Sequence, residues 1–431
     1  MKTDGAEEHR GITLEILENM FADHLPGTVR VRLWDGTVWP DPSDKTEAEI
    51  VLNHPSAMRA MLQSGTEVGL GEAFLYDDFN VTGNLESVFE SADRIAGPSR
   101  SWGDKIYLGN LVRKLPPPPA RARSRRAAAS LSGSVHSQDR DRNAIAYHYD
   151  VSNDFYKIWL DKRMVYSCGY FRSPDDPLDD AQEQKLDLMC RKLRLRPGQT
   201  LLDIGCGWGA LVAFAAANYG VHATGITLSE PQVEYAAELL ESLGLSDRAQ
   251  VSLLDYRAVT ATDPYDAIVS VGMFEHVGRE TLPVYFQKAF QLVKPGGVFL
   301  NHGIASGSAR QEQVDRKTSF SQNYVFPDGE LVPISTTLRV AHESGFEVRD
   351  LESFREHYQL TLRHWVRRLE SNHDVALRYV DEPTYRVWRL FMAGGAYDFG
   401  SGNLNVYQAL LVRPTDEGRS GVPLTREDWY Q

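Results

Sequence analysis

The sequence feature that most constrains the fold is a short apolar run that ends in a cluster of glycines. Residues 201–209 read LLDIGCGWG, and a helical pattern follows them. A buried strand here would deliver the chain to a tight turn, where glycines let the backbone approach a ligand that a β-carbon would push away. The run therefore predicts a strand–turn–helix unit, either as a ligand site or simply as a tight connection.

The spacing of the glycines narrows the kind of ligand. Pyridine-nucleotide sites usually read G-x-G-x-x-G, whereas Gly205, Gly207 and Gly209 read G-x-G-x-G with Ala210 next. This variant suggests a different adenosine cofactor, for which S-adenosylmethionine is the leading candidate. The carboxylate of Asp203 can point at an amine or a hydroxyl of such a ligand.

Strand and helix patterns alternate around this turn. The patterns predict strands at 200–204, 221–226, 249–254, 267–271, 297–301 and 405–412, with helices at 178–193, 209–219, 230–243 and 282–293. Such alternation is typical of an α/β, doubly wound and mostly parallel sheet with helices on both faces. Ligands of these sheets lie outside the carboxyl ends of the strands. We expect a sharp turn at 294–297 and a cap over the site at 303–340.

Composition shifts divide the chain into three parts. Residues 1–112 predict a small α+β domain with a hairpin around 28–39, a turn leading into a helix at 69–78, and helices at 56–64 and 85–95. Residues 113–142 read as a linker stiffened by prolines 116–119, with basic residues and no acid over 113–126. This stretch is either a solvated connector or a strap that seeks phosphates or lipid headgroups. We expect residues 143–431 to form one larger domain around the predicted sheet.

Charge and cysteine content exclude several classes of protein. The formal net charge of the 431 residues is −13, which disfavours nucleic-acid binding. The sequence has no run of 18 apolar residues and no signal-peptide pattern. Its three cysteines, Cys168, Cys190 and Cys206, are widely spaced, so a disulfide framework is not expected and a reducing cytoplasm fits.

Polar residues follow the second and third strands of the predicted sheet. Many adenosine sites place an acid after the second strand, but this chain offers Thr227 and Gln232. These two residues either hold the ribose or only cap the next helix. The tripeptide Asp255-Tyr256-Arg257 offers an aromatic face and a carboxylate to an adenine.

Other polar residues lie after the fourth and fifth strands. Glu275 and His276 follow the fourth strand and His302 follows the fifth, while Cys168 and Tyr358 lie in aromatic-rich segments. The spacing lacks the paired ligands of a zinc site, so no metal is expected. A nucleophilic cysteine with a histidine partner remains an alternative, although Cys168 is better interpreted as a core residue.

Five stretches together resemble the cyclopropane-fatty-acid synthase family of methyltransferases. They are residues 147–156, 166–170, 202–209, 270–278 and 324–329. The N-terminal part is similar, more loosely, to that of the family's phospholipid-acting members. The resemblance implies a Rossmann-like class I methyltransferase fold with a lipid-covering cap.

The resemblance also implies a reaction. An alkene in a lipid acyl chain would attack the methyl group of S-adenosylmethionine, and a bound bicarbonate would remove a proton so that a cyclopropane ring closes. The family pattern assigns bicarbonate to the side chains of Glu275, His302 and Tyr358 and to the backbones of Cys168 and Ile304. It assigns the cofactor to Tyr166, Ser167, Asp203, Gly205, Gly207, Gly209, Thr227, Gln232, Asp255, Tyr256 and Arg257.

Two alternatives stay open at this point. The same carbocation can give a methylene- or methyl-branched chain, and a catalytically silent lipid-binding protein belongs to a different class. The resemblance implies a phospholipid membrane surface as partner, a cytoplasmic location at the inner face of the membrane, and by analogy a homodimer.

Overall fold

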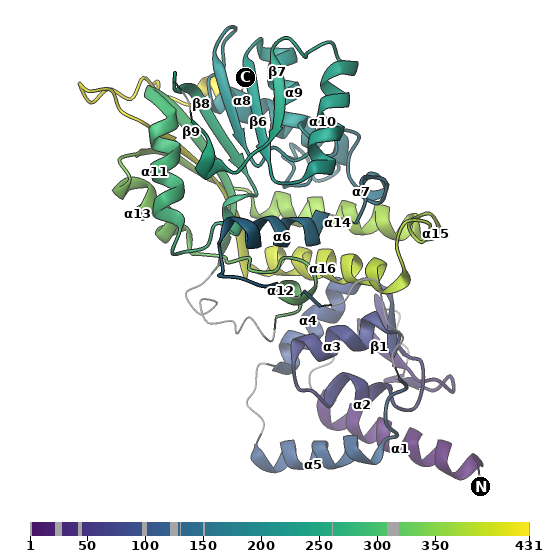
Figure 1. Cartoon of the computed structure of the whole chain (residues 1–431). Helices are drawn as coiled ribbons and strands as arrows, with labels where there is room; N and C mark the ends of the chain where they lie inside the picture. The colour runs from purple at the N-terminus through teal and green to yellow at the C-terminus, as the bar shows by residue number, and fades with distance from the viewer. Residues whose placement is uncertain are drawn as a thin grey trace. The chain divides into compact units, whose positions relative to one another are not determined.

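The computed structural model describes residues 2–21, 28–41, 45–96, 101–120, 128–129, 131–149, 151–260, 262–307 and 319–430 (Figure 1). The chain divides into two compact units. The first comprises Met1–Ala128, Val314–Val325 and Val380–Tyr397, and the second comprises Ala129–Gln313, Phe326–Tyr379 and Asp398–Gln431.

The second unit is built around a seven-stranded sheet with the order β10-β11-β9-β8-β5-β6-β7. All neighbours are parallel except β11, which runs antiparallel to both β9 and β10. The strands are β5 (Thr200–Ile204), β6 (His222–Thr227), β7 (Ala249–Leu253), β8 (Tyr265–Val271), β9 (Val293–Ser306), β10 (Glu347–Ser353) and β11 (Leu404–Val412). The predicted α/β, mostly parallel sheet is thus confirmed.

Helices flank this sheet in two groups (Figure 1). The first group is α8 (Leu178–Lys192), α9 (Ala210–Tyr219) and α10 (Glu230–Ser242), and the second is α11 (Leu282–Leu292) and α13 (Ile334–Glu343). Aromatic and aliphatic side chains such as Ile268, Phe286, Phe299 and Phe346 form one buried cluster between the sheet and the second group. Burial of this apolar surface, at about 25 cal/mol per Å², is the main term that holds the layers together.

Several segments of this unit differ from the sequence prediction. Strand β9 begins at Val293, so the turn expected at 294–297 and the cap expected from 303 were wrong where this strand occupies them. The prediction failed because Pro295, Gly296 and Gly297 read as a break, whereas the strand continues through them with a shift in its register against β8 between Val293 and Val298. Residues 308–318 of the expected cap lie outside the described residues.

Several helices after residue 137 were not predicted. They include α6 (Gln138–Tyr149), α7 (Asn153–Trp159), α14 (Arg355–Ser371) and α16 (Glu382–Ser401). Aromatic and charged residues alternate in these helices without a simple apolar stripe at helical spacing. The sequence pattern that predicts a helix is therefore missing. Helix α6 occupies the end of the stretch interpreted as a linker, and α5 (Trp102–Lys114) reaches its start. Residues 121–127, with four of the six basic residues of the expected strap, lie outside the described residues, while Arg113 and Lys114 end α5.

The first unit has a four-stranded sheet of order β2-β1-β3-β4. Its strands are β1 (Val29–Arg32), β2 (Val38–Trp39), β3 (Ala48–Leu52) and β4 (Phe79–Gly83), and its helices include α1 (Lys2–Phe21), α2 (Ala57–Leu62), α3 (Glu67–Leu75) and α4 (Leu85–Ala96). The predicted hairpin is confirmed by the antiparallel β1–β2 pair. The helix expected within 69–78 is confirmed by α3, but the turn expected before it was wrong, because Gly69 and Gly71 lie inside this helix. A β-carbon at Gly71 would lie 2.3 Å from the ring of Phe320, so close packing accounts for that glycine.

Segments from late in the chain complete the first unit. The buried guanidinium of Arg386 on α16 donates to the carbonyl of Phe74 at 2.9 Å and pairs with the carboxylate of Asp77 at 2.7 Å. Arg389, one turn further along, donates to the carbonyl of Val81 at 3.0 Å. A buried guanidinium needs acceptors of this kind, so residues 380–397 are structurally part of this unit.

We predict that Arg386→Met destabilises the first unit by about 2 kcal/mol, because it removes the buried charged donor that joins α16 to the carbonyl of Phe74 and to the carboxylate of Asp77. Hydrogen exchange of the β3 and β4 amides should accelerate accordingly. Arg339→Met is the matched control, since its ion pair with Glu343 on α13 is exposed. Equal exchange in the two variants would contradict this role for Arg386.

Candidate active site

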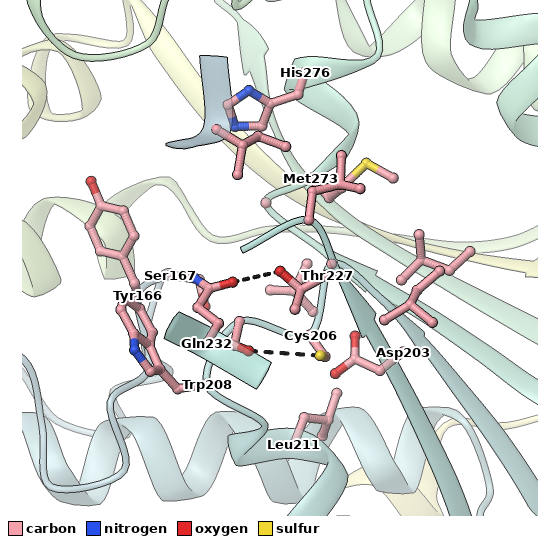
Figure 2. Close-up of a pocket in the computed structure, with 18 of the residues that line it drawn as sticks. Tyr166, Ser167, Asp203, Cys206, Trp208, Leu211, Thr227, Gln232, Met273 and His276 are labelled. Atoms are coloured by element: carbon pink, nitrogen blue, oxygen red, sulfur yellow. Dashed lines mark hydrogen bonds between the residues drawn. The ribbon is translucent and has the colours of Figure 1, made fainter. Parts of the chain in front are cut away.

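A pocket opens at the carboxyl ends of β5, β6, β7 and β8 (Figure 2). Its wall includes all of the predicted cofactor residues except Gly209: Tyr166, Ser167, Asp203, Gly205, Gly207, Thr227, Gln232, Asp255, Tyr256 and Arg257. The position follows from the sheet order, because the chain leaves β5 toward β6 while β8 lies on its other side. Such a point of reversal leaves a crevice between the loops.

The three glycines of the turn serve different purposes. All have positive φ, at 81° for Gly205, 55° for Gly207 and 82° for Gly209. A β-carbon at Gly205 would lie 2.7 Å from the Cβ of Met273, whereas one at Gly207 would meet no atom within 4 Å. A β-carbon at Gly209 would lie 2.9 Å from the Cβ of Ala236 on α10. Gly209 therefore serves helix packing, and Gly205 and Gly207 shape the pocket wall.

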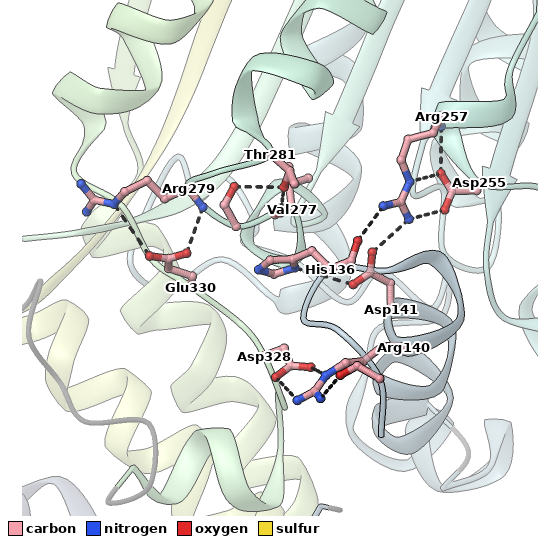
Figure 3. A network of polar contacts seen from close by, with 12 residues as sticks. His136, Arg140, Asp141, Asp255, Arg257, Val277, Arg279, Thr281, Asp328 and Glu330 are labelled. Atoms are coloured by element: carbon pink, nitrogen blue, oxygen red, sulfur yellow. Dashed lines mark hydrogen bonds and ion pairs between the residues drawn. The ribbon is translucent and has the colours of Figure 1, made fainter. Parts of the chain in front are cut away.

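Neutral and charged groups on the pocket wall already bond to each other. The hydroxyl of Thr227 donates to Oε1 of Gln232 at 2.6 Å. The guanidinium of Arg257 donates to both carboxylate oxygens of Asp255 at 2.9 and 2.6 Å. It also donates to the carboxylate of Asp141 on α6 at 2.9 Å (Figure 3). These ion pairs fix α6, which itself lines the pocket with Asp141, Ile145 and Tyr149.

The predicted catalytic residues form a second cluster beside the pocket. Glu275 lies in the short helix η2 (Phe274–His276), two residues after Met273 and directly before His276, both of which line the pocket. Its Oε1 accepts a hydrogen bond from the backbone N–H of Ile304 at 2.7 Å. Cys168 follows the wall residues Tyr166 and Ser167. The same two chain segments therefore form parts of both the pocket and the cluster.

Strand β9 and helix α14 supply the remaining members. His302 lies in β9, and its ring packs edge-on against Phe354 with 5.7 Å between centroids. The thiol of Cys168 points to the carbonyl of Phe354 at 3.6 Å, and the N–H of Gly169 donates to the hydroxyl of Thr361 at 2.9 Å. These contacts attach the Tyr166–Gly169 segment to α14, which carries Tyr358.

Burial sets the protonation of this cluster. It raises the pKa of Glu275 to about 7, and the N–H of Ile304 counters part of that rise. Burial lowers the pKa of His302 well below its usual value, helped by the charges of Lys185 and Lys192. The pKa of Tyr358 and the pKa of Cys168 are both raised, first by burial. At neutral pH the imidazole is therefore neutral, and the phenol and thiol keep their protons.

The protonated, fully buried thiol of Cys168 argues against the alternative of a nucleophilic cysteine, because thiolate is the reactive form.

Within the described residues, no three His, Cys, Asp or Glu side chains are grouped so as to hold a metal ion. None of the helices described is long and apolar enough to cross a membrane.

Several buried polar atoms of the cluster lack protein partners. Among the described residues, Oε2 of Glu275 and both ring nitrogens of His302 receive or donate no hydrogen bond. Unsatisfied buried polar atoms are costly and point to a ligand that completes them. A small oxyanion such as bicarbonate fits this donor set, since a neutral imidazole, a phenol and a half-protonated carboxyl can each offer a proton. The N–H of Ile304 already donates to Oε1 of Glu275. The predicted contact between Ile304 and bicarbonate would therefore require this N–H to be shared between the two acceptors.

Aromatic rings surround both parts of the site. Tyr149, Tyr166 and Trp208 line the pocket. Tyr149 meets Trp208 with 5.9 Å between centroids, and Tyr166 meets Trp365 at 5.3 Å. Electron-rich faces of this kind stabilise a nearby cation.

Sequence reasoning missed Lys185 and the wall residues of α6. Lys185 lies on the buried face of α8 with Ala181, Leu188 and Lys192. A lysine at helical spacing inside an apolar stripe is a detectable anomaly, because buried lysines are rare unless paired.

Comparison with known families identifies the chain. Residues 136–409 match the family model described as mycolic acid cyclopropane synthetase, and residues 16–99 match a domain of unknown function. The fold and the pocket define an S-adenosylmethionine-dependent class I methyltransferase. The chain belongs to the mycolic acid cyclopropane synthetase family, which confirms the resemblance inferred from its motifs.

Two relatives match most of the chain. A probable fatty acid methyltransferase of Pseudomonas putida is 40% identical over 95% of this chain and 97% of its own length. The cyclopropane-fatty-acyl-phospholipid synthase of Escherichia coli is 32% identical over 86% of this chain and 89% of its own length. The structure of mycolic acid cyclopropane synthase CmaA1 complexed with SAH and CTAB is 34% identical, with a TM-score of 0.58 over 63% of this chain and 97% of that one.

We predict that Glu275→Gln stabilises the protein more at pH 8 than at pH 5. A carboxyl whose pKa rises on folding from 4.5 to about 7 gives stability that is present at low pH and is lost as pH rises through the folded value. The gain should reach on the order of 3 kcal/mol at pH 8 and be small at pH 5.

Thermal unfolding of both proteins at the two pH values measures this difference. Glu241→Gln on α10 is the matched control, because Glu241 is exposed. A Glu275→Gln gain that is the same at pH 5 and pH 8 would show that Glu275 ionises normally in the folded protein.

Proposed function

We propose that this protein transfers the methyl carbon of S-adenosylmethionine to the double bond of unsaturated phospholipid acyl chains and closes a cyclopropane ring. The observation that carries the proposal is a buried polar cluster with unsatisfied atoms beside a pocket that is lined by ten of the predicted cofactor residues. The segments Tyr166–Cys168 and Met273–Glu275 contribute to both. Methyl transfer alone would need the pocket, whereas proton removal needs the cluster as well.

The first task of the protein is alignment. The bound donor supplies an electrophilic methyl group on a sulfonium, and an alkene is a weak nucleophile toward it. The walls formed by Tyr166, Trp208 and Met273 would hold the two reactants in line and exclude water, which is where most of the rate must come from. Helix α6, fixed by the pair between Asp141 and Arg257, would close the pocket on one side.

The second task is to stabilise positive charge. Attack by the alkene leaves a carbocation, and Tyr149, Tyr166 and Trp365 present ring faces near the cluster. Tyr358 meets Trp365 with 6.1 Å between centroids and extends this aromatic wall. Contacts of this type are worth about 0.5 to 2 kcal/mol each when desolvated.

The third task is to hold a base. Bicarbonate, when bound by the cluster, would supply the base that takes a proton from the former methyl group. Oε2 of Glu275 and the ring of His302 have free hydrogen-bonding capacity for it. The raised pKa of Tyr358 keeps its hydroxyl protonated as a donor. A carboxyl with a pKa of about 7 can also donate a proton, so Glu275 need not repel an anion.

One alternative has specific support. The Pseudomonas putida relative is named a probable fatty acid methyltransferase, so this chain could form a methylene- or methyl-branched product from the same carbocation. The filled cluster of Glu275, His302 and Tyr358 favours a product formed by proton loss, because it offers a site for a base. Ring and methylene both form in this way, whereas a saturated methyl branch would need a hydride donor instead.

The substrate places the proposed reaction at a phospholipid membrane surface. We propose that the chain works at the inner face of the cell membrane as a peripheral protein, alone or as a homodimer. The E. coli relative named a cyclopropane-fatty-acyl-phospholipid synthase covers nearly the whole chain, which supports the assignment of phospholipid as the substrate.

We predict that the purified protein, given S-adenosylmethionine and oleoyl phospholipid vesicles, adds the mass of one CH2 group to the acyl chain. Mild catalytic hydrogenation should leave the mass of this product unchanged, as mass spectrometry would show, because a cyclopropane resists conditions that reduce an exocyclic methylene. A product that takes up hydrogen would favour the methylene alternative, and an unchanged lipid would contradict methyl transfer to phospholipid.

We further predict that Tyr358→Phe lowers kcat by about tenfold to a hundredfold while the Kd for S-adenosylmethionine changes little. The hydroxyl bonds the base in this account, and a hydrogen bond to a charged group is worth about 1.5 to 3 kcal/mol. Tyr379→Phe is the matched control, since Tyr379 is 43% exposed. Equal losses in turnover and in cofactor affinity would assign Tyr358 to the cofactor pocket instead.

A further inference from the structure

Lys185 is a buried charged residue of the pocket wall to which no role has been assigned so far. It lies on α8, is 1% exposed, and lines the pocket with its side chain. Its Nζ donates to the hydroxyl of Ser167 at 2.9 Å. Burying an ammonium group in an apolar wall is costly unless a partner charge compensates it.

No carboxylate of the described residues lies within ion-pair distance of Lys185. Asp161 is occupied by the backbone N–H groups of Val165 at 2.7 Å and Arg163 at 3.0 Å. Burial lowers the pKa of Lys185 to about 8, and the carboxylates of Asp161 and Asp203 oppose that fall. The side chain is therefore still largely an ammonium ion at neutral pH.

Lys192 offers an internal comparison on the same helix. It lies two turns further along α8 and is also buried, but it pairs with the carboxylate of Glu352 and donates to Oε1 of Gln408 at 2.7 Å. Lys192 thus has a protein counter-ion, whereas Lys185 lines the pocket and donates only to the hydroxyl of Ser167.

The hydroxyl of Ser167 links the ammonium to the pocket. A serine hydroxyl has one proton to donate and lone pairs to accept with. Because it accepts from Lys185, its own proton remains available, and the described residues offer it no acceptor. The carbonyl of Ser167 is held by Nε2 of Gln182 at 2.8 Å, so the residue is fixed in position.

We propose that Lys185 and Ser167 form a recognition pair for a carboxylate-type anion in the wall of the cofactor pocket. Ser167 would donate to the anion directly, and Lys185, acting through Ser167, would be a positioning residue that supplies the positive charge. Two anions share this chemistry: the amino-acid carboxylate of the methyl donor and the small oxyanion of the neighbouring cluster. The inference rests on binding of S-adenosylmethionine and not on which lipid product forms.

Calorimetry on the purified full chain tests the pair without any lipid. The two probes are S-adenosylhomocysteine and 5′-methylthioadenosine, which carries the same adenosine thioether without the amino-acid part. If the donor carboxylate is the ligand, Lys185→Met should weaken S-adenosylhomocysteine binding about tenfold to a hundredfold. Binding of 5′-methylthioadenosine should change less than about twofold. Ser167→Ala should show the same selectivity to a smaller extent.

Lys192→Met is the matched control for loss of a buried lysine, and Lys185→Arg should largely restore S-adenosylhomocysteine binding. If Lys185→Met leaves both probes unchanged but raises the bicarbonate concentration needed for half-maximal methyl transfer, the oxyanion is the ligand of the pair.

Two results would overturn the pair altogether. One is an equal loss of affinity for both probes in Lys185→Met, especially if Lys192→Met shows it too, since that marks structural support only. The other is no change in either probe or in bicarbonate dependence. Ser167→Ala and Lys185→Arg keep the proposal testable if Lys185→Met does not fold.

Discussion

The close approach of two loops at the carboxyl ends of β5 and β8 is the constraint on which the rest of the site depends. Gly205, with φ of 81°, turns the chain where any β-carbon would meet Met273 at 2.7 Å. The loop that carries Met273 continues into Glu275. A larger residue at Gly205 would therefore displace the cofactor wall and the polar cluster together, because they share this backbone.

This shared backbone would let one fold combine the two chemical tasks that we propose, methyl donation and proton removal. The segment 166–168 passes from the pocket, at Tyr166 and Ser167, to the cluster, at Cys168. The segment 273–275 does the same from the opposite side. A donor and a base held on common segments keep a fixed relation to each other, which is what reaction of a weak alkene nucleophile requires. Lys185 bonds to the first of these segments and so stiffens the connection.

Much of the catalytic fold could be predicted because local sequence and final environment agree. Leu201, Leu202 and Ile204 read as a buried strand and are buried in the middle of the sheet. The glycine spacing also located the pocket. The prediction failed where long-range contacts decide: Arg386 and Arg389 complete a unit whose strands lie three hundred residues earlier, and nothing in the local pattern of α16 indicates this. Gly209 was predicted to contact the ligand, because its packing against Ala236 is a long-range contact that the local sequence does not indicate.

The central claim is that a carbon taken from S-adenosylmethionine loses a proton at the polar cluster while bonded to a lipid double bond. Mass spectrometry of the lipid formed with a donor whose methyl group is fully deuterated tests it most directly. The account predicts a ring carbon that keeps two deuterium atoms and has lost the third. A lipid that retains all three deuterium atoms, as in a methyl branch, would contradict it.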